Sequence, residues 1–337
     1  AKDIAINANQ GSVIEGNSTV GGVISDIQTN GGLTANYSNF EATGLTIEGV
    51  MNGGGISGII SRQTLNGATV ENVTIVSDDA RKGIISGALG GKSTITNISY
   101  ENVTGTENIV GAPYEGTQAQ GSMTVEGVEY TYNNGWFVDG YQIIANGLLK
   151  KDNEYKVINA NGLVALSGIT IKGGEVVTLG ADIDLNGVVF NGLNAFNPEN
   201  NNTFDGKGFT VSNWTNNSGA SDMGFIKNWV GPIKNVKFDN CHLKTAGRSA
   251  IVAAKVYGNI EKIEVKNSSI EDSYWACGII AGLYNSGSIS DCSVIDSSVK
   301  SNGGTAAIVG VINETAGERN LTNCSVTNTT INNTGAY

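Results

Sequence analysis

A repeated unit, seen most clearly in residues 276 to 299, limits what this chain can fold into more than any other feature. In that copy a glycine-rich segment and a polar loop precede Ile289, Cys292 and Val294. Related copies follow one another along the chain, and each contains an apolar residue preceded by Asn, Asp, Lys or Gly. These apolar residues are Phe40, Val73, Ile98, Val128, Trp214, Val236, Ile263, Cys292 and Cys324. Their spacing within each half of the chain is 22 to 33 residues.

The residues that follow these positions alternate between apolar and polar. The residue two places on is apolar or aromatic in most copies: Ala42, Ile75, Tyr100, Tyr130, Phe238, Val265, Val294 and Val326. The residue between the two is polar in each of these copies, from Glu41 to Ser325. Alternation with a period of two is typical of a strand with one buried face. The repeat therefore predicts one such strand in each copy.

A second conserved spacing within the chain places Asn or Asp two residues after the second apolar position. These residues are Asn102 in the first half and Asn240, Asn267, Asp296 and Asn328 in the second. An aliphatic residue follows three places later in the second half: Leu243, Ile270, Val299 and Ile331. Asn tolerates a left-handed φ and its side chain bonds nearby backbone, so this position predicts a sharp bend. Stacked bends would form a ladder of side-chain amides.

Each copy therefore contains about three short strands, and a unit of that size cannot bury its apolar face alone. We predict an all-β fold, a right-handed parallel β-helix with coils of about 25–32 residues. The presence of only three prolines suits this fold, because proline removes a donor from a strand ladder. A β-sandwich of hairpins is the alternative, but it would show turns about every 8 to 12 residues.

The segment from Trp136 to about residue 202 lacks the repeat. We predict a first β-helical region over residues 1–135, a connector over 136–155, and a second β-helical region over 156–337. The second region begins with a short helix near 159–167, for which Asn159 is the expected N-cap.

Composition narrows the classes of partner. A net charge of −11 and a pI near 4.6 argue against nucleic acid, whose phosphates need clustered Lys and Arg. No apolar run of about 18 residues is present, so no transmembrane segment is predicted. The opening AKDIAINANQ has no signal-peptide pattern, so we expect any targeting segment to be absent from this chain. No cofactor is predicted.

The four cysteines are Cys241, Cys277, Cys292 and Cys324, and they form no CxxC pair. With His242 as the only histidine, zinc-type spacing is absent, and we expect small buried side chains. Cys292 and Cys324 occupy one column on successive coils. We predict that both are reduced, with a disulfide as the alternative.

Four stretches of the second region resemble the GLUG-motif repeat proteins of bacterial cell surfaces: EYKVINANGLVALSG, TLGADIDLNG, NTFDGKGFTVSNWT and ACGIIAGLYNSGSISDCSV. The likeness covers residues 154 to 337, whereas residues 1 to 135 share only the coil pattern. The last coil departs from it by carrying residues 314–320 in place of a short glycine turn. The resemblance implies a secreted or surface-anchored, adhesin-like β-helix without a shared catalytic set.

The outward column offers no clear catalytic pair. It contains Glu41, Thr74, Ser99, Glu129, Thr215, Lys237, Glu264, Ser293 and Ser325. An acid–base site would need neighbouring carboxylates, and no two acids are adjacent here. The charged neighbours Lys237 and Glu264 are expected to form a cross-strand ion pair. We predict no catalytic residues.

Two further clusters have a chemical and a structural interpretation. Asp182, Asp184 and Asp205 could supply carboxylates to calcium, but capping and turn formation are favoured. His242 and Cys241 could form a nucleophilic dyad, but no third residue completes it. No metal site is predicted.

Aromatic side chains give the strongest indication of binding. Trp229, Tyr257 and Tyr284 follow the same strand in three consecutive coils and could form an exposed stripe that stacks on sugars or on a protein. Tyr274 and Trp275 could form a second patch. The alternative is that these aromatic side chains cover a corner of the coil.

Together these features predict a secreted or cell-surface, non-enzymatic β-helix that functions in adhesion or in binding a glycan or protein. One alternative is a carbohydrate-active β-helix enzyme, either a polysaccharide lyase or a hydrolase. Another is a structural spacer within a larger surface protein. The ligand and the oligomeric state are left open.

Overall fold

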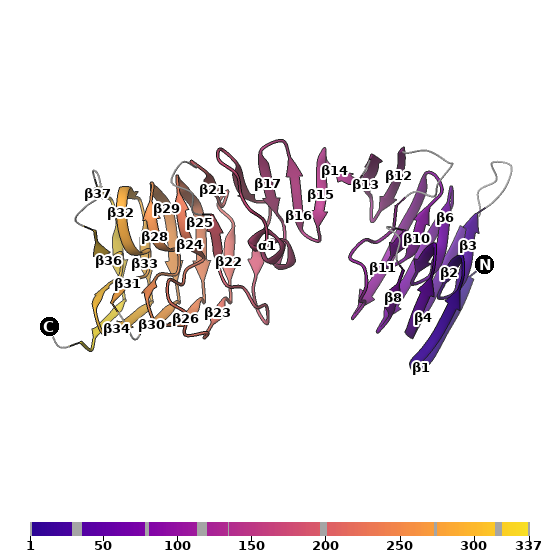
Figure 1. Ribbon diagram of the computed structural model, residues 1–337, viewed down its shortest axis with the longest axis horizontal. Coiled ribbons are helices and arrows are strands. Elements are labelled where there is room, and N and C mark those ends of the chain that lie inside the picture. The colour runs from indigo at the N-terminus through magenta and orange to yellow at the C-terminus, as the bar shows by residue number, and fades with distance from the viewer. Residues whose placement is uncertain are drawn as a thin grey trace. The chain divides into compact units, whose positions relative to one another are not determined.

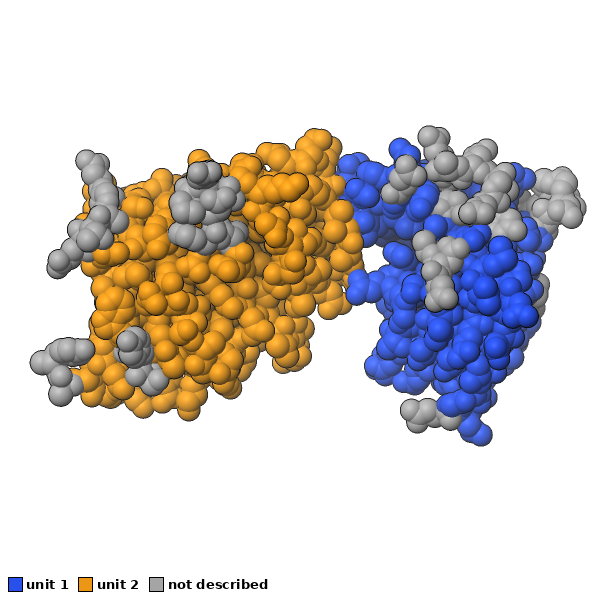
Figure 2. All heavy atoms as spheres, in the orientation of Figure 1, with its two compact units in different colours: residues 1–143 blue, residues 144–337 orange. Residues whose placement is uncertain are grey.

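The computed structural model describes residues 2–28, 36–77, 81–112, 120–133, 135–195, 201–272, 275–313 and 319–335. The chain divides into two compact units, unit 1 from Ala1 to Ile143 and unit 2 from Ile144 to Tyr337 (Figure 2). The division lies within residues 136–155, the segment predicted as a connector. Strands make up most of both units, and α1 (Ala160–Ser167) is the single helix of the described residues (Figure 1).

Unit 1 consists mainly of short strands stacked in parallel. Its coil strands are β1 (Lys2–Gly16), β2 (Thr19–Gly21), β3 (Ile24–Gln28), β4 (Asn36–Gly49), β5 (Asn52–Gly54), β6 (Ser57–Ser61), β7 (Thr64–Glu71), β8 (Thr74–Val76), β9 (Lys82–Gly83), β10 (Ser86–Leu89) and β11 (Ser93–Glu101). Strands β1, β4, β7 and β11 pair in this order, and β2–β5–β9 and β3–β6–β10 form two smaller parallel sheets. The prediction of a parallel β-helix is confirmed.

Unit 1 ends in antiparallel strands. β12 (Gln120–Val125) pairs in parallel with β11, and β13 (Val128–Asn133), β14 (Trp136–Val138) and β15 (Tyr141–Ala145) then follow in antiparallel order. Gly127, predicted to begin a coil, instead lies in the turn of the β12–β13 hairpin with a φ of 80°. The predicted inward position of Val128 is therefore wrong, and this side chain is 41% exposed.

Unit 2 begins with the antiparallel pair β16 (Leu148–Lys151) and β17 (Glu154–Val157). α1 follows, and Asn159 caps it as predicted, accepting a 2.9 Å hydrogen bond from the Gly162 N–H through Oδ1. The side chains of Leu163 and Leu166 are buried in the core of the unit, and Figure 1 shows the helix at the start of the stack. The predicted position of the helix is confirmed.

The remaining strands of unit 2 are β18 (Val176–Leu179), β19 (Ile183–Asp184), β20 (Leu193–Ala195), β21 (Thr203–Asp205), β22 (Thr210–Ser212), β23 (Thr215–Asn216), β24 (Ile226–Val230), β25 (Ile233–Asp239), β26 (His242–Thr245), β27 (Arg248–Ser249), β28 (Ala253–Tyr257), β29 (Ile260–Lys266), β30 (Ser269–Asp272), β31 (Ala276–Gly278), β32 (Ala281–Ser290), β33 (Ser293–Ile295), β34 (Ser298–Ser301), β35 (Gly304–Ala306), β36 (Val309–Ile312), β37 (Arg319–Thr322), β38 (Ser325–Thr327) and β39 (Thr330–Asn333). They pair in parallel between successive coils, for example as β23–β26–β30–β34–β39 and as β27–β31–β35.

Residues with a left-handed φ mark two bends in each regular coil, five residues apart. The first bend is at Asn39, Gly67, Asn97, Asn235, Lys262, Asp291 and Asn323, and the second at Gly44, Asn72, Asn102, Asn240, Asn267, Asp296 and Asn328. Their φ angles lie between 46° and 91°. Short polar residues and glycine tolerate this conformation, which explains their dominance at the two bends. The predicted bend at the second position is confirmed.

The register corrects two of the sequence alignments. The repeat aligns Asn72 and Asn213 with Asn39 and Asn235, but β4–β8 pairing and β22–β25 pairing place them at the second bend. In unit 1 the first-bend residues are therefore Asn39, Gly67 and Asn97, separated by 28 and 30 residues. The error arose because Asn occupies both bends and because Gly67 can replace it at the first.

Aromatic side chains fill the first coils of unit 2. Phe225 lies within 6.3 Å, centroid to centroid, of each of four other rings. The four rings belong to Phe190, Phe204, Trp214 and Phe238. All five side chains are at most 1% exposed, and their tilted and edge-to-face geometry is favourable for aromatic pairs.

Candidate functional site

The predicted aromatic stripe is not a surface feature. Trp229 and Tyr284 are 1% and 2% exposed, and both lie opposite Val256 in one inward column of β24, β28 and β32. Trp229 Nε1 donates to the carbonyl of Asn202 at 3.1 Å, and the Tyr284 hydroxyl donates to that of Gly287 at 2.5 Å. For these two residues the prediction of exposure is wrong, and the corner-covering alternative describes them better.

The other predicted aromatic binding residues lie outside the inward column of Trp229 and Tyr284. Tyr257 is half-buried and lies one position beyond the inward column, opposite Val230. Trp275 is 41% exposed and precedes β31, in a different sheet. Tyr274 lies outside the described residues. The five predicted binding residues are therefore not brought together as one patch, and their role in binding stays a prediction.

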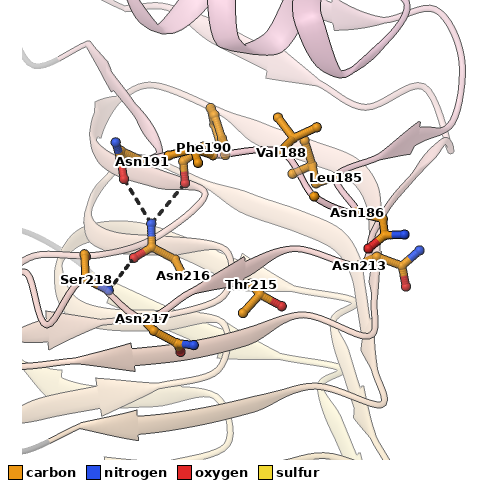
Figure 3. Close-up of a pocket in the computed structure, with 12 residues that line it drawn as sticks. Leu185, Asn186, Val188, Phe190, Asn191, Asn213, Thr215, Asn216, Asn217 and Ser218 are labelled. Carbon is orange, nitrogen blue, oxygen red and sulfur yellow. Dashed lines mark hydrogen bonds between the residues drawn. The ribbon is translucent and has the colours of Figure 1, made fainter.

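A groove in unit 2 brings together polar side chains that the sequence analysis did not assign to a binding site (Figure 3). It has a volume of about 340 Å³ and lies between the loop 185–191 of the first coil and the segment 213–218 of the second. Its polar lining consists of Asn186, Asn191, Asn213, Thr215, Asn216, Asn217 and Ser218. All of these side chains are neutral amides or hydroxyls, so the lining carries hydrogen-bonding groups without formal charge.

Asn216 closes one end of the groove. Its Nδ2 donates to the carbonyl of Phe190 and to Oδ1 of Asn191, each at 3.1 Å, and its Oδ1 accepts from the Ser218 N–H at 3.1 Å. Figure 3 shows these three bonds between the loop and the strand segment. Trp214 Nε1 donates to the same Phe190 carbonyl at 3.0 Å. Beyond Leu185, whose N–H donates to the Ser212 carbonyl at 2.9 Å, the loop is thus joined to the second coil by side chains.

Strand β23 forms one wall of the groove and is the edge strand of its sheet. Thr215 pairs with His242, whose N–H donates to the carbonyl of Trp214. In a parallel bridge of this kind the N–H and C=O of Thr215 point to the opposite edge of the strand. That edge faces the first coil, so the groove is bordered by backbone polar groups as well as side chains.

Three side chains of the lining have hydrogen-bonding capacity to spare. Asn186, Thr215 and Asn217 are exposed, and none of the three side chains forms a hydrogen bond within the described residues. Val189, on the loop, is 78% exposed and adds an apolar surface beside them. The groove therefore combines donors, acceptors and aliphatic side chains, Val189 and the half-buried Val188 among them, on a scaffold held by the coil.

The sequence missed this groove because Asn213 was assigned to the wrong bend. With Asn213 at the second bend, the residue three places later is Asn216, in the column of Leu243 and Ile270. A polar residue in an otherwise aliphatic column is the signal that could have located the site.

The three aspartates considered for calcium have structural contacts. Asp184 Oδ1 accepts from the Asn186 N–H and from Asn213 Nδ2, each at 2.9 Å, and Asp182 Oδ1 accepts from the Thr210 N–H at 2.8 Å. Asp205 Oδ1 accepts from the Lys207 N–H and from Asn235 Nδ2. These contacts support the turn-forming interpretation. Within the described ranges no group of three or more His, Cys, Asp or Glu side chains could hold a metal ion.

The remaining chemical candidates also have structural roles. Both ring nitrogens of His242 are hydrogen-bonded at 2.8 Å, to Ser269 and Asn240, while Cys241 is fully buried. Burial raises the pKa of the Cys241 thiol to about 12, which disfavours the nucleophilic thiolate. Lys237 and Glu264 are opposite in register, but Glu264 pairs with Lys266 at 3.0 Å, so the predicted ion pair is wrong.

Comparison with known proteins yields one distant structural neighbour. No known family model matches the chain, and no curated protein matches it. A crystal structure of a candidate immunoglobulin A1 protease from Bacteroides ovatus aligns over 53% of this chain and 77% of that one, with 18% identity and a TM-score of 0.39. In the described part of the chain, no helix has the length and hydrophobicity needed to cross a membrane.

Proposed function

We propose that this protein is a non-enzymatic β-helix, secreted or displayed on a cell surface, that makes adhesive contacts with a glycan or a surface protein. The observation that carries the proposal is the amide- and hydroxyl-lined groove beside β23. Its exposed Asn186, Thr215 and Asn217 side chains have unused hydrogen-bonding groups on a scaffold of paired strands. Binding sites built on regular elements are well positioned for specific recognition.

The likeness to GLUG-motif repeat proteins supports the same proposal, because those proteins are surface-associated and share no catalytic set. It rests on four stretches between residues 154 and 337, two of which contain part of the groove lining, residues 185–187, 213 and 215. A carbohydrate-active enzyme and a structural spacer are the competing functions.

One experiment separates the three functions. The immobilised wild-type chain would be tested for binding to a panel of oligosaccharides, polysaccharides and extracellular-matrix proteins, and the polysaccharides would be assayed for new reducing or unsaturated ends. We expect saturable binding without cleavage. Release of new ends would contradict the non-enzymatic proposal, and failure to bind any member of the panel would favour the spacer.

A further inference from the structure

We propose that the groove between residues 185–191 and 213–218 is a binding site for a neutral glycan, which it recognises through one sugar residue. This inference rests on the proposed function and names its ligand class and its site. The groove volume of about 340 Å³ is at the small end of the range typical of ligand pockets, about 300 to 1,000 Å³. It therefore suits a small ring better than an extended polymer segment.

The chemistry of the lining selects for a hydroxyl-rich ligand. Thr215, in β23, and Asn217, just after it, lie two positions apart and so share a face, and both have free side-chain donors and acceptors. Neighbouring hydroxyls of a sugar ring both donate and accept hydrogen bonds, as these side chains do. Asn186 offers a second free amide from the opposite wall.

Charge excludes an acidic ligand from the centre of the site. Every polar side chain in the lining is neutral, and the carboxylate of Asp184 accepts hydrogen bonds from the Asn186 N–H and from Asn213 Nδ2 of the wall. A sulfated or carboxylated sugar would find no cationic side chain in the lining to pair with. A neutral sugar would leave the hydrogen bonds of Asp184 in place.

Val189 is the most exposed of the apolar side chains that line the site. A pyranose ring presents C–H groups as well as hydroxyls, and an aliphatic side chain can cover the C–H face. Val189 is 78% exposed, the highest value among the exposed large hydrophobic side chains of the described residues. A peptide strand paired to β23 is the competing ligand, but β23 spans only Thr215–Asn216 and gives a very short ladder.

The test uses the full-length chain and an array of neutral, sialylated and sulfated oligosaccharides, followed by calorimetric titration with the strongest neutral binder. We expect Thr215→Ala and Asn217→Ala each to weaken binding about five- to tenfold, as the loss of one hydrogen bond predicts. Val189→Asp should weaken it at least as much. Thr330→Ala is the matched control, because Thr330 occupies the same column on β39 at the other edge of the sheet.

The outcomes distinguish this inference from the proposed function. The groove inference and the proposed function are both supported if the chain binds a neutral glycan, the groove variants weaken this binding and Thr330→Ala does not. Binding of a glycan or matrix protein that survives the groove variants would overturn the groove inference and leave the proposed function standing. Preference for acidic glycans would overturn the inference as well. Absence of binding to every glycan and matrix protein would overturn both.

Discussion

Asn240 donates from its side-chain amide to Oδ1 of Asn213 at 2.7 Å, and both residues have a left-handed φ, 54° and 55°. Asn213 in turn donates to Asp184 at 2.9 Å. Elsewhere, too, Asn amides at the bends donate toward the preceding coil, as Asn235 does to Asp205 and Asn323 to Asp291. The bends therefore shape each coil and also tie it to the one before.

Replacing Asn240 separates these two roles. Asn240→Ala should lower the free energy of unfolding by about 2 to 3 kcal/mol, because it adds left-handed strain of about 1 kcal/mol and removes the side-chain hydrogen bonds to Asn213 and His242. Asn240→Gly removes the same hydrogen bonds without the strain and should lie about 1 kcal/mol closer to wild type. Urea unfolding would measure both, with the outward Lys237→Ala as control. Equal losses for Ala and Gly would contradict the role of the φ angle.

Position within a column should set the cost of removing an aliphatic side chain. Ile270 and Ile331 belong to the same column of the sheet β23–β26–β30–β34–β39. Ile270 is 2% exposed, whereas Ile331, in the last coil, is 50% exposed. We expect Ile270→Ala to lower the free energy of unfolding by about 2 to 5 kcal/mol, and Ile331→Ala to lower it by roughly half of that or less. Parallel urea titrations of the two variants would check this, and equal costs would refute the assigned column geometry.

The pH dependence of stability should show a contribution from Asp205. Burial acts to raise the pKa of this carboxyl, but hydrogen bonds from Asn235 and from the Lys207 N–H, with the Lys207 ammonium at 3.2 Å, hold it below its usual value of 3.8. A carboxyl whose pKa is lower in the folded state stabilises the fold above its unfolded pKa and loses that effect as the pH falls through the folded value. Stability should therefore decline below about pH 4, and less steeply in Asp205→Asn.

Thermal unfolding between pH 2 and 6 would measure this effect, with Glu261→Gln as a control for general loss of negative charge. Identical pH profiles for wild type and Asp205→Asn would show that the carboxyl titrates alike in the folded and unfolded chain.

The repeat was enough to predict the parallel β-helix because each bend imposes a backbone conformation that few residues tolerate. It was not enough to assign every copy. Asn at both bends makes positions five residues apart look alike, as Asn72 and Asn213 show. Counting from a strand also failed for Trp229 and Tyr284, since one position along a strand changes an outward side chain into an inward one. The groove depends on the hydrogen bonds of Asn216 to a loop; the column alignment marks Asn216 as a polar exception, but it does not say which residues this side chain contacts.

Thiol accessibility should differ sharply among the four free cysteines. Burial raises the pKa of Cys292 to about 12 and raises that of Cys277 as well, whereas Cys324, opposite Cys292 in the next coil, is partly exposed. At pH 8 a thiol reagent should label one cysteine, Cys324, in the folded protein and all four after denaturation. Cys324→Ser should abolish labelling of the folded protein. Two fewer thiols than expected in the denatured protein would indicate the Cys292–Cys324 disulfide instead.

Asn216 is the residue on which the groove depends, and its replacement by leucine gives the sharpest test of that dependence. Leucine would match the aliphatic side chains of Leu243 and Val299 in the same column, but it would remove three hydrogen bonds to residues 190, 191 and 218. Because Trp214 still donates to the Phe190 carbonyl, we expect the fold to be retained and the free energy of unfolding to fall by about 1 to 3 kcal/mol. Hydrogen exchange should become faster in the loop 185–191 and remain unchanged in β26 and β30. Asn216 would not be the link between loop and coil if exchange became faster throughout unit 2, or if it did not become faster in the loop.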